Sequence, residues 1–325
     1  MAANYWDSTQ AKYWSFSKTD LSALRNHLAS THHQLYTKYS MPERRLVAIY
    51  IQQNLIKLAR RMTLRQQALA TAQVYIKRFY LRVEIRKTNP YLIMATAVYL
   101  ACKMEECPQH IRHMLGEAAR QWPELGVTES SKIGECEFAL ISTLSSRLIL
   151  HHPYRSLGEL TPLFGLSSEE VNLAQSVIND SYCTDLPLLY PPHITAITAI
   201  FLAIVLRPSG SNIGLQPYSS SPTTASPTSA SPYSGGPFSN PGMPSGNPAM
   251  PASAAQQALL GGLSGLQQAR PKLAKLIDWL AESKVDMAQI VDATQEMVSL
   301  YQVWEEYSER TVKEAISRFV NGSGK

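Results

Sequence analysis

The sequence lacks long apolar runs and any recognisable export signal. Its most apolar stretch, Ile194 to Leu206, spans thirteen residues, whereas a membrane-spanning helix needs roughly 20, so we expect a buried core helix there. The N-terminus, MAANYWDSTQ, has no basic region followed by an apolar run, which excludes a typical secretory signal peptide. These absences predict a soluble intracellular protein without a membrane segment.

Paired cysteines and catalytic motifs are also missing. None of the four cysteines (Cys102, Cys107, Cys136 and Cys183) belongs to a CxxC pair, so we expect reduced thiols rather than a disulfide framework or a zinc site. There is no GxSxG, P-loop, GxGxxG or HExxH motif. The adjacent pairs His32-His33 and His151-His152 lack the i, i+4 spacing that directs two imidazoles at one metal. The sequence therefore predicts a protein that is not an enzyme and needs no metal or cofactor.

Charge is absent from one long segment. No charged residue occurs between Pro208 and Ala269, and ten of the twenty prolines lie between Pro208 and Pro251. A segment so rich in Pro, Ser and Gly cannot bury enough apolar surface to offset its loss of conformational entropy. We predict a disordered insertion at 208–270. Its Ser-Pro pairs, repeated every five residues from Ser221, are either targets of proline-directed kinases or low-complexity sequence.

Outside this insertion the apolar residues recur with helical spacing. From Leu64 to Phe79 they advance by three or four positions, as on one face of an amphipathic helix. Asn89 followed by Pro90 is a typical helix start, and the next run, YLIMATAVYLAC, is apolar all round, like a helix buried on every side. Ser167 and Glu170 have the spacing of a capping box. With no clear strand pattern, the chain is predicted to be all-α.

One helical pattern occurs twice. PYLIMATAVYLA from Pro90 and PHITAITAIFLA from Pro192 share five residues at an offset of 102 positions, and the helices before them also align. Chance similarity between two apolar helices is the alternative explanation. Agreement over two successive helices favours a duplicated helical domain of about a hundred residues. The second copy would be split by the insertion and would resume near Lys272.

Glu137 has an unexpected position. It lies four residues from both Ile133 and Ile141 on an otherwise apolar helical stripe. A carboxylate there is either solvated at the helix edge or buried with a partner, because an unpaired buried charge is costly. Lys103, at the end of the first copy's buried helix, is the candidate partner, whereas the aligned position in the second copy is Val205. This difference suggests an asymmetric binding surface.

Basic residues are concentrated between Met41 and Pro90. Eleven Lys and Arg face two Glu there, a local excess of +9. The eleven are Arg44, Arg45, Lys57, Arg60, Arg61, Arg65, Lys77, Arg78, Arg82, Arg86 and Lys87. Such a face suits nucleic acid or an acidic partner, or it is simply solvated. Because no aromatic platform or nucleic-acid motif accompanies it, direct nucleic-acid binding is disfavoured.

Aromatic residues are dense near the N-terminus, before a helix predicted to start near Asp20. The five in question are Tyr5, Trp6, Tyr13, Trp14 and Phe16. Clustered aromatics outside the repeats are typical of a docking segment that packs on a core or on a partner.

Several segments together resemble the cyclin C family, the cyclin subunits of the Mediator kinase module of RNA polymerase II. They are NYWDSTQ, LRQQALATAQVYIKRFYLR, YLACKMEE, ECEFAL, HPYRSL, TDLPLLYPPHI and SKVDMAQI. The resemblance covers about 1–206 and 272–310. It implies an N-terminal docking segment and helix (1–40), a first five-helix cyclin repeat (41–150) and a second repeat (151–325) interrupted by the insertion.

The same resemblance implies a kinase-binding site in the first repeat. In cyclins a Lys at the end of the third helix and a Glu in the fifth lie at the kinase interface, and the matching positions here are Lys103 and Glu137. The other residues it brings to this surface are Met104, Glu105, Glu106, Ile141, Trp6 and Trp14. Asn179 and Asp180 are candidates for lining a groove between the repeats.

The sequence also departs from the cell-cycle cyclins. Their MRAIL-like docking patch corresponds to VAIYIQQN from Val47, and an Asp that pairs with Arg in those cyclins is replaced by Lys77. Substrate docking through that patch is therefore in doubt. Transcription cyclins share this loss, which supports the narrower resemblance.

We therefore expect a regulatory subunit that binds and activates the cyclin-dependent kinase of the Mediator kinase module. It would regulate RNA polymerase II transcription in the nucleus, as repressor or activator, including phosphorylation of the polymerase C-terminal domain. Other Mediator subunits and the RNA polymerase II holoenzyme are further expected partners. One alternative is another transcription cyclin, against which NYWDSTQ and SKVDMAQI argue. The other is a cyclin-fold general transcription factor that binds nucleic acid, although the zinc ribbon usual in such factors is not visible.

Overall fold

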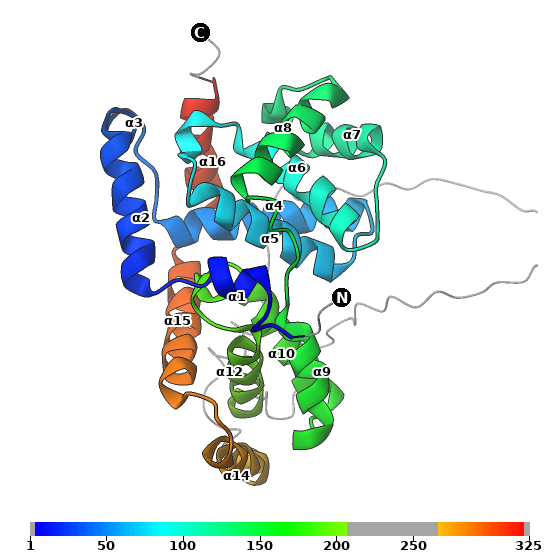
Figure 1. Cartoon of the computed structure of the whole chain (residues 1–325), viewed down its shortest axis with the longest axis vertical. Coiled ribbons are helices and arrows are strands. Elements are labelled where there is room, and N and C mark those ends of the chain that lie inside the picture. The colour runs from blue at the N-terminus through cyan, green and yellow to red at the C-terminus, as the bar shows by residue number, and fades with distance from the viewer. Residues whose placement is uncertain (1–3, 207–265, 322–325) are drawn as a thin grey trace, which may run out of the picture.

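The computed structural model describes residues 4–206 and 266–321 (Figure 1). Within these ranges the regular structure consists of α-helices and two short 3₁₀ helices, so the all-α prediction is confirmed. The predicted disordered insertion, 208–270, lies outside the described residues except at its end. There helix α14 (Leu266–Glu282) begins before the expected restart near Lys272, because Leu, Gln and Ala favour helix.

The helices fall into three groups along the chain. The N-terminal group contains α1 (Thr9–Tyr13), α2 (Lys18–Thr31) and α3 (His33–Lys38). The first half continues with α4 (Arg44–Arg61), α5 (Gln66–Tyr80), α6 (Pro90–Met104), α7 (Ile111–Gln121) and α8 (Ser130–Thr143), and with 3₁₀ helices at Ile85–Lys87 and Pro123–Leu125. The second half contains α9 (Pro153–Phe164), α10 (Ser168–Ser181), α11 (Leu186–Leu189), α12 (Pro192–Val205), α14, α15 (Met287–Glu305) and α16 (Glu309–Val320).

The starts of the helices follow the local signals. The Asn89 side chain accepts a hydrogen bond from the N–H of Tyr91, with Pro90 in the first turn of α6. At the start of α10, the predicted capping box is confirmed, because Ser167 and Glu170 accept each other's backbone N–H groups. These caps satisfy backbone donors that the first helical turn leaves without intrahelical partners.

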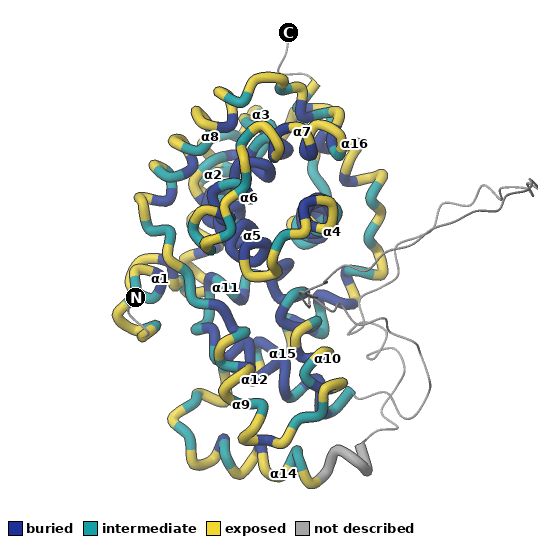
Figure 2. Tube along the Cα trace, turned by 90° about the vertical axis from the view of Figure 1, so that its right-hand side faces the viewer, coloured by how far each residue is buried: buried dark blue, intermediate teal, exposed yellow. Residues whose placement is uncertain are grey.

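Two hydrophobic cores form around the two copies of the repeated sequence. In the upper half of Figure 1, α6 is buried between α5 and α8. In the lower half, α12 is buried among α9, α10, α14 and α15. Figure 2 shows the buried residues concentrated on these inner helices, with exposed residues along the outer ones. Each helix that carries the repeated pattern thus lies at the centre of one of the two cores.

The two cores share some of their helices. Helix α16 is the last in sequence, yet Val312, Ile316 and Phe319 are buried in the first core (Figure 1). Trp14, from the N-terminal segment, belongs to the same core. Helix α4 contributes to both, since most of its apolar residues lie in the first core and Ile49 lies in the second. The two halves are therefore interlocked.

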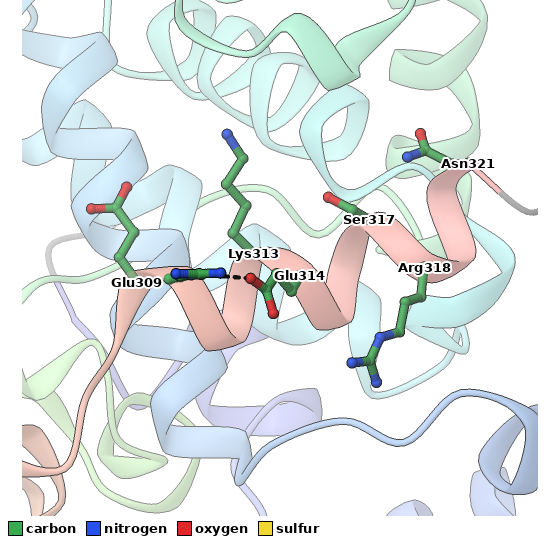
Figure 3. Close-up of a pocket in the computed structure, with 7 residues that line it drawn as sticks. Glu309, Lys313, Glu314, Ser317, Arg318 and Asn321 are labelled. Carbon is green, nitrogen blue, oxygen red and sulfur yellow. Dashed lines mark hydrogen bonds and ion pairs between the residues drawn. The ribbon is translucent and has the colours of Figure 1, made fainter.

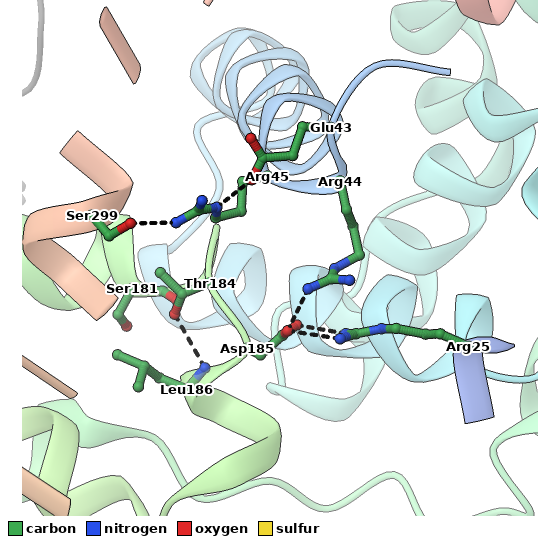
Figure 4. Close-up of polar contacts among 9 residues, drawn as sticks. All are labelled: Arg25, Glu43, Arg44, Arg45, Ser181, Thr184, Asp185, Leu186 and Ser299. Carbon is green, nitrogen blue, oxygen red and sulfur yellow. Dashed lines mark hydrogen bonds and ion pairs between the residues drawn. The ribbon is translucent and has the colours of Figure 1, made fainter. Parts of the chain in front are cut away.

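A partly buried carboxylate also connects the two halves. Asp185, which precedes α11, accepts two hydrogen bonds from Arg25 of α2, at 2.8 and 2.9 Å, and one from Arg44 of α4 at 2.8 Å (Figure 4). Burial alone would raise the pKa of Asp185, but the charges of Lys77, Arg25 and Arg44 hold it at about 2. Lys77, the residue that replaces the Asp of cell-cycle cyclins, thus faces a carboxylate here.

Candidate functional site

Lys103 and Glu137 form the ion pair that the sequence predicted. Lys103 Nζ, at the end of α6, lies 2.7 and 3.0 Å from the two carboxylate oxygens of Glu137 on α8. The Lys103 side chain is 42% exposed and that of Glu137 is 14% exposed, so the pair lies at the rim of the first core and can be reached by a partner. Ile133 and Leu140, which flank Glu137 on the buried face of α8, lie inside that core.

The lysine is held by two neighbours. Partial burial would lower the pKa of Lys103, but its hydrogen bond to Glu137 and the opposite charge outweigh this effect, so the pKa is raised. Lys103 Nζ also lies 4.6 Å from the ring centroid of Tyr99, within the range of a cation–π contact. The ammonium group is therefore charged and fixed in position before any partner binds.

An exposed apolar strip runs beside this pair. Phe138, next to Glu137 on α8, is 77% exposed, the largest value among the exposed large hydrophobic side chains. Ile141, one turn further along, is half-buried, as is Met104 of α6. An apolar strip around a partly buried ion pair is typical of a protein–protein contact. Phe138 was not among the residues predicted from the sequence, although its place off the buried stripe of α8 was a usable signal.

The two acidic residues after Lys103 behave differently. Glu105 is turned toward α5, where Gln67 Nε2 and the Thr71 hydroxyl donate to its carboxylate at 2.7 and 2.6 Å. Its carboxylate is therefore engaged inside the protein rather than offered to a partner. Glu106 is exposed and has a φ of 55°, a left-handed conformation that few non-glycine residues adopt.

The two tryptophans expected to contact the kinase also differ in their exposure. Trp6 is 62% exposed, with its ring near those of Tyr5 and His193. Trp14 is 1% exposed and packs in the first core. The expectation that Trp14 contacts a kinase directly is therefore corrected, since its burial leaves almost no surface for a partner.

Between the two halves, Asn179 and Asp180 lie at different depths. Asn179 is half-buried, and its side-chain oxygen accepts from Gln66 at 3.1 Å and from Tyr154 at 2.8 Å. Asp180 is buried and accepts from the hydroxyl of Tyr301 at 3.2 Å. Burial leaves Asp180 little surface for a ligand, whereas a role for Asn179 in a groove between the repeats stays a prediction.

Acids from other segments offset part of the basic charge between Met41 and Pro90. Arg44 pairs with Asp185, Lys57 with Glu309 and Arg61 with Glu117. Arg45 and Arg86 pair with the two local acids, Glu43 and Glu84. The surface is therefore less positive than the local sequence indicated, and the case for nucleic-acid binding weakens.

The exposed face of α16 offers a contrasting arrangement. Its side chains from Glu309 to Asn321 include both acidic and basic groups, and Arg310 pairs with Glu314 (Figure 3). Ion pairs on an exposed helix contribute little to the stability of the protein, and charges of both signs do not form a patch that would attract a charged partner. In the part of the chain that the structure describes, no three His, Cys, Asp or Glu side chains are grouped to hold a metal ion.

Comparison with known proteins decides the family. Residues 14–149 match the model of the cyclin N-terminal domain. The RNA polymerase II holoenzyme cyclin-like subunit of Aspergillus clavatus is 50% identical over 320 residues, covering 98% of each chain. That of Neurospora crassa is 50% identical over 342 residues, covering 100% of this chain and 99% of its own. The chain belongs to this cyclin family. The predicted resemblance is thereby confirmed, and the protein is a regulatory kinase subunit, not a catalytic one.

Solved structures support the fold of this cyclin. A chain of the CAK complex from Chaetomium thermophilum, solved with ATP-gamma-S, matches with a TM-score of 0.56 at 18% identity, covering 98% of this chain and 88% of its own. A chain of the yeast TFIIK complex matches with a TM-score of 0.50 at 21% identity, covering 61% and 85%. Both similarities establish the cyclin fold. None of the helices in residues 4–206 and 266–321 is long and apolar enough to cross a membrane.

Proposed function

We propose that this cyclin binds and activates the cyclin-dependent kinase of the Mediator kinase module. As part of the RNA polymerase II holoenzyme in the nucleus, it would contact other Mediator subunits and regulate transcription through phosphorylation of the polymerase C-terminal domain. The observation that carries the proposal is the partly exposed Lys103–Glu137 ion pair, in a chain 50% identical to a holoenzyme cyclin-like subunit over 98% of its length.

The proposed contact surface consists of the ion pair and the apolar strip beside it. Its members are Lys103, Glu137, Met104, Phe138, Ile141, Glu106 and Trp6. The ion pair would orient the kinase on the cyclin, while the exposed Phe138 supplies apolar surface that is removed from water on binding. Asn179 remains a proposed lining residue of a groove between the repeats.

Activation would follow from selective binding. A cyclin has no catalytic group, so it acts by binding the active arrangement of the kinase more tightly than the inactive one. A shift of about 100-fold in that equilibrium needs about 2.7 kcal/mol of differential affinity. A few buried contacts at the Lys103–Glu137 surface are enough for this.

The decisive experiment is co-purification of the full chain with its Mediator kinase, followed by kinase activity with and without the cyclin. We expect a one-to-one complex with raised activity. Glu137→Lys and Lys103→Glu should each weaken binding by at least about tenfold, because each leaves two like charges together at the contact. Wild-type affinity in both variants would refute the site, and no complex at low salt would refute the function.

A double variant separates contact from folding. Lys103→Glu combined with Glu137→Lys restores an internal ion pair of reversed polarity, so we expect wild-type helicity and a wild-type melting temperature. Kinase binding should stay weak, because the charges presented to the kinase are exchanged. Recovery of binding in the double variant would mean that the pair only stabilises the cyclin.

A further inference from the structure

Three arginines gather around two aromatic rings of the N-terminal segment. Arg78 on α5 and Arg82 in the turn that follows this helix lie with their Cζ atoms 4.8 and 4.5 Å from the ring centroid of Trp14. Arg147, in the loop after α8, lies 3.4 Å from the ring centroid of Tyr13. Arg78 also donates to the backbone carbonyl of Arg147 at 3.3 Å, so the three side chains belong to one group, the arginine cluster.

No acid balances this arginine cluster. Among the described residues no carboxylate forms an ion pair with any of the three, although five other basic residues of the same region are paired. The insertion between Pro208 and Ala269 contains no Asp or Glu that could supply one. Positive charge without a paired carboxylate favours the arrival of an anion.

The arginine cluster also has N–H groups that form no hydrogen bond with the described residues. Arg78 is fully buried, and its Nε and Nη2 atoms have no hydrogen-bond partner. Arg82 is exposed and uses Nη1 for the carbonyl of Thr143 and the hydroxyl of Ser145. Arg147 is half-buried, with no side-chain hydrogen bond to a described residue. A guanidinium stacked on a ring through its flat face keeps its N–H edge free for a two-pronged bond to an oxyanion.

The arginine cluster adjoins the proposed kinase surface. Arg82 donates to Thr143, the last residue of α8, and to Ser145 just after this helix, which carries Glu137 and Ile141. Tyr13, whose ring covers Arg147, is 50% exposed. The cluster thus continues the same surface toward the N-terminal segment, with Arg82 and Arg147 accessible and Arg78 adding its charge from below.

We propose that Arg82 and Arg147 bind carboxylate side chains of an acidic segment of the kinase, an inference that rests on the proposed kinase binding. Arg78 positions and reinforces the two accessible arginines from within the core. Trp14 and Tyr13 hold the guanidinium groups in place, which gives the buried Trp14 an indirect role at the interface. A partner carboxylate supplies the negative charge that the chain itself does not provide.

Association kinetics of the full chain with its kinase test this proposal. Arg82→Glu and Arg147→Glu should each slow association about tenfold at low salt, with a smaller effect at high salt, because screened charges steer less. Arg147→Gln should give an intermediate loss without introducing a repulsive charge. The matched control is Arg318→Glu on the exposed face of α16, which should leave association unchanged. Melting temperatures establish that each variant is folded.

The outcomes separate the two proposals. If the wild type binds and Glu137→Lys weakens binding while the Arg82 and Arg147 variants bind normally, the arginine cluster proposal fails and the kinase-binding proposal stands. If the wild type does not bind at all, both fail. If the arginine variants lose affinity for DNA but not for the kinase, the cluster serves nucleic acid and the proposal is overturned.

A cross-linking experiment identifies the ligand. A photoreactive benzoylphenylalanine in place of Tyr13 should cross-link to a kinase segment that contains Asp or Glu, and changing those acids to Asn or Gln should reproduce the Arg82→Glu defect. A cross-link to a segment without acids would contradict the proposal. Phosphatase treatment of the kinase should leave its binding to the cyclin unchanged. A loss of binding would mean that the arginines bind a phosphate group instead of a carboxylate.

Discussion

Single buried polar residues connect the two halves of this cyclin, and His152 is central among them. Its Nε2 lies 2.7 Å from the Thr71 hydroxyl, and its Nδ1 lies 2.6 Å from the hydroxyl of Tyr182. Because Thr71 donates its one proton to Glu105, it must accept from Nε2–H, and Nδ1 then accepts from Tyr182. With the imidazole neutral, as its burial favours, each of these hydrogen bonds joins one donor to one acceptor.

His152 should make stability depend on pH. Burial, reinforced by the charges of Arg78 and His151, lowers the pKa of His152 to about 3, while an unfolded histidine has a pKa of about 6.5. The unfolded chain therefore takes up this proton first, so stability is full above about pH 6.5 and falls as the pH decreases toward 3. From pH 7 to pH 5 we expect a loss of about 2 kcal/mol from this residue.

Urea unfolding of the wild type and of His152→Asn at the two pH values checks this expectation. Other histidines titrate in both proteins, so only the difference between the two pH profiles reports on His152. The variant should be less stable at pH 7 but should lose less on acidification. Identical pH profiles would show that the imidazole is not held neutral.

Among the helices, α2 is held to the molecule mainly by charge. Leu21 is the one residue of α2 that is buried, whereas Arg25 forms two bonds to Asp185 and Lys18 pairs with Asp292. A helix with so little apolar contact depends on its polar attachments, since apolar burial is the usual source of helix stability in proteins.

Asp185→Asn should therefore loosen α2. The change leaves Arg25 and Arg44 beside a neutral amide, and the loss of hydrogen bonds to a charged group in this partly buried position costs about 1.5–3 kcal/mol. We expect hydrogen exchange in α2 to accelerate by at least about tenfold while α5 and α6 keep their protection. The control is Glu159→Gln, which breaks an exposed pair with Arg155 and should cost under about 1 kcal/mol. Equal protection in α2 would contradict this account.

On the scale of the whole molecule, the last helix completes the first core. Helix α16 follows the second half in sequence, but Val312, Ile316 and Phe319 are at most 1% exposed within the first core. The C-terminal end of the chain thus packs against the first repeat, whose other helices end with α8. The stability of the first half accordingly depends on residues about 200 positions later in the chain.

Phe319→Ala should destabilise the whole protein by about 3–5 kcal/mol, because a fully buried phenylalanine leaves a cavity when it is removed. The free energy of unfolding from urea titration checks this value. The neighbouring Arg318→Ala is the control, since an exposed side chain away from special contacts changes stability by about 0.5 kcal/mol or less. Similar values for both variants would mean that α16 does not complete the core.

Local patterns predicted much of the fold and part of the site. The spacing of apolar residues predicted helices, and the repeated PYLIMATAVYLA pattern predicted the two equivalent buried helices, since 3.6-residue periodicity and capping depend on neighbours within a few positions. Lys103 and Glu137 could be paired from the sequence because a carboxylate on an apolar stripe needs a partner. The asymmetry of the two repeats follows from the same residues.

Tertiary structure alone decided the rest. The burial of Trp14, the inward turn of Glu105 and the return of α16 to the first core depend on contacts between segments distant in sequence, which no local pattern reports. The net charge of the basic region likewise depended on acids contributed by other helices. The sequence by itself determined which faces are apolar and where charge is scarce. Only packing decided which of those faces meet, because that choice minimises the exposed apolar area of the whole chain at once.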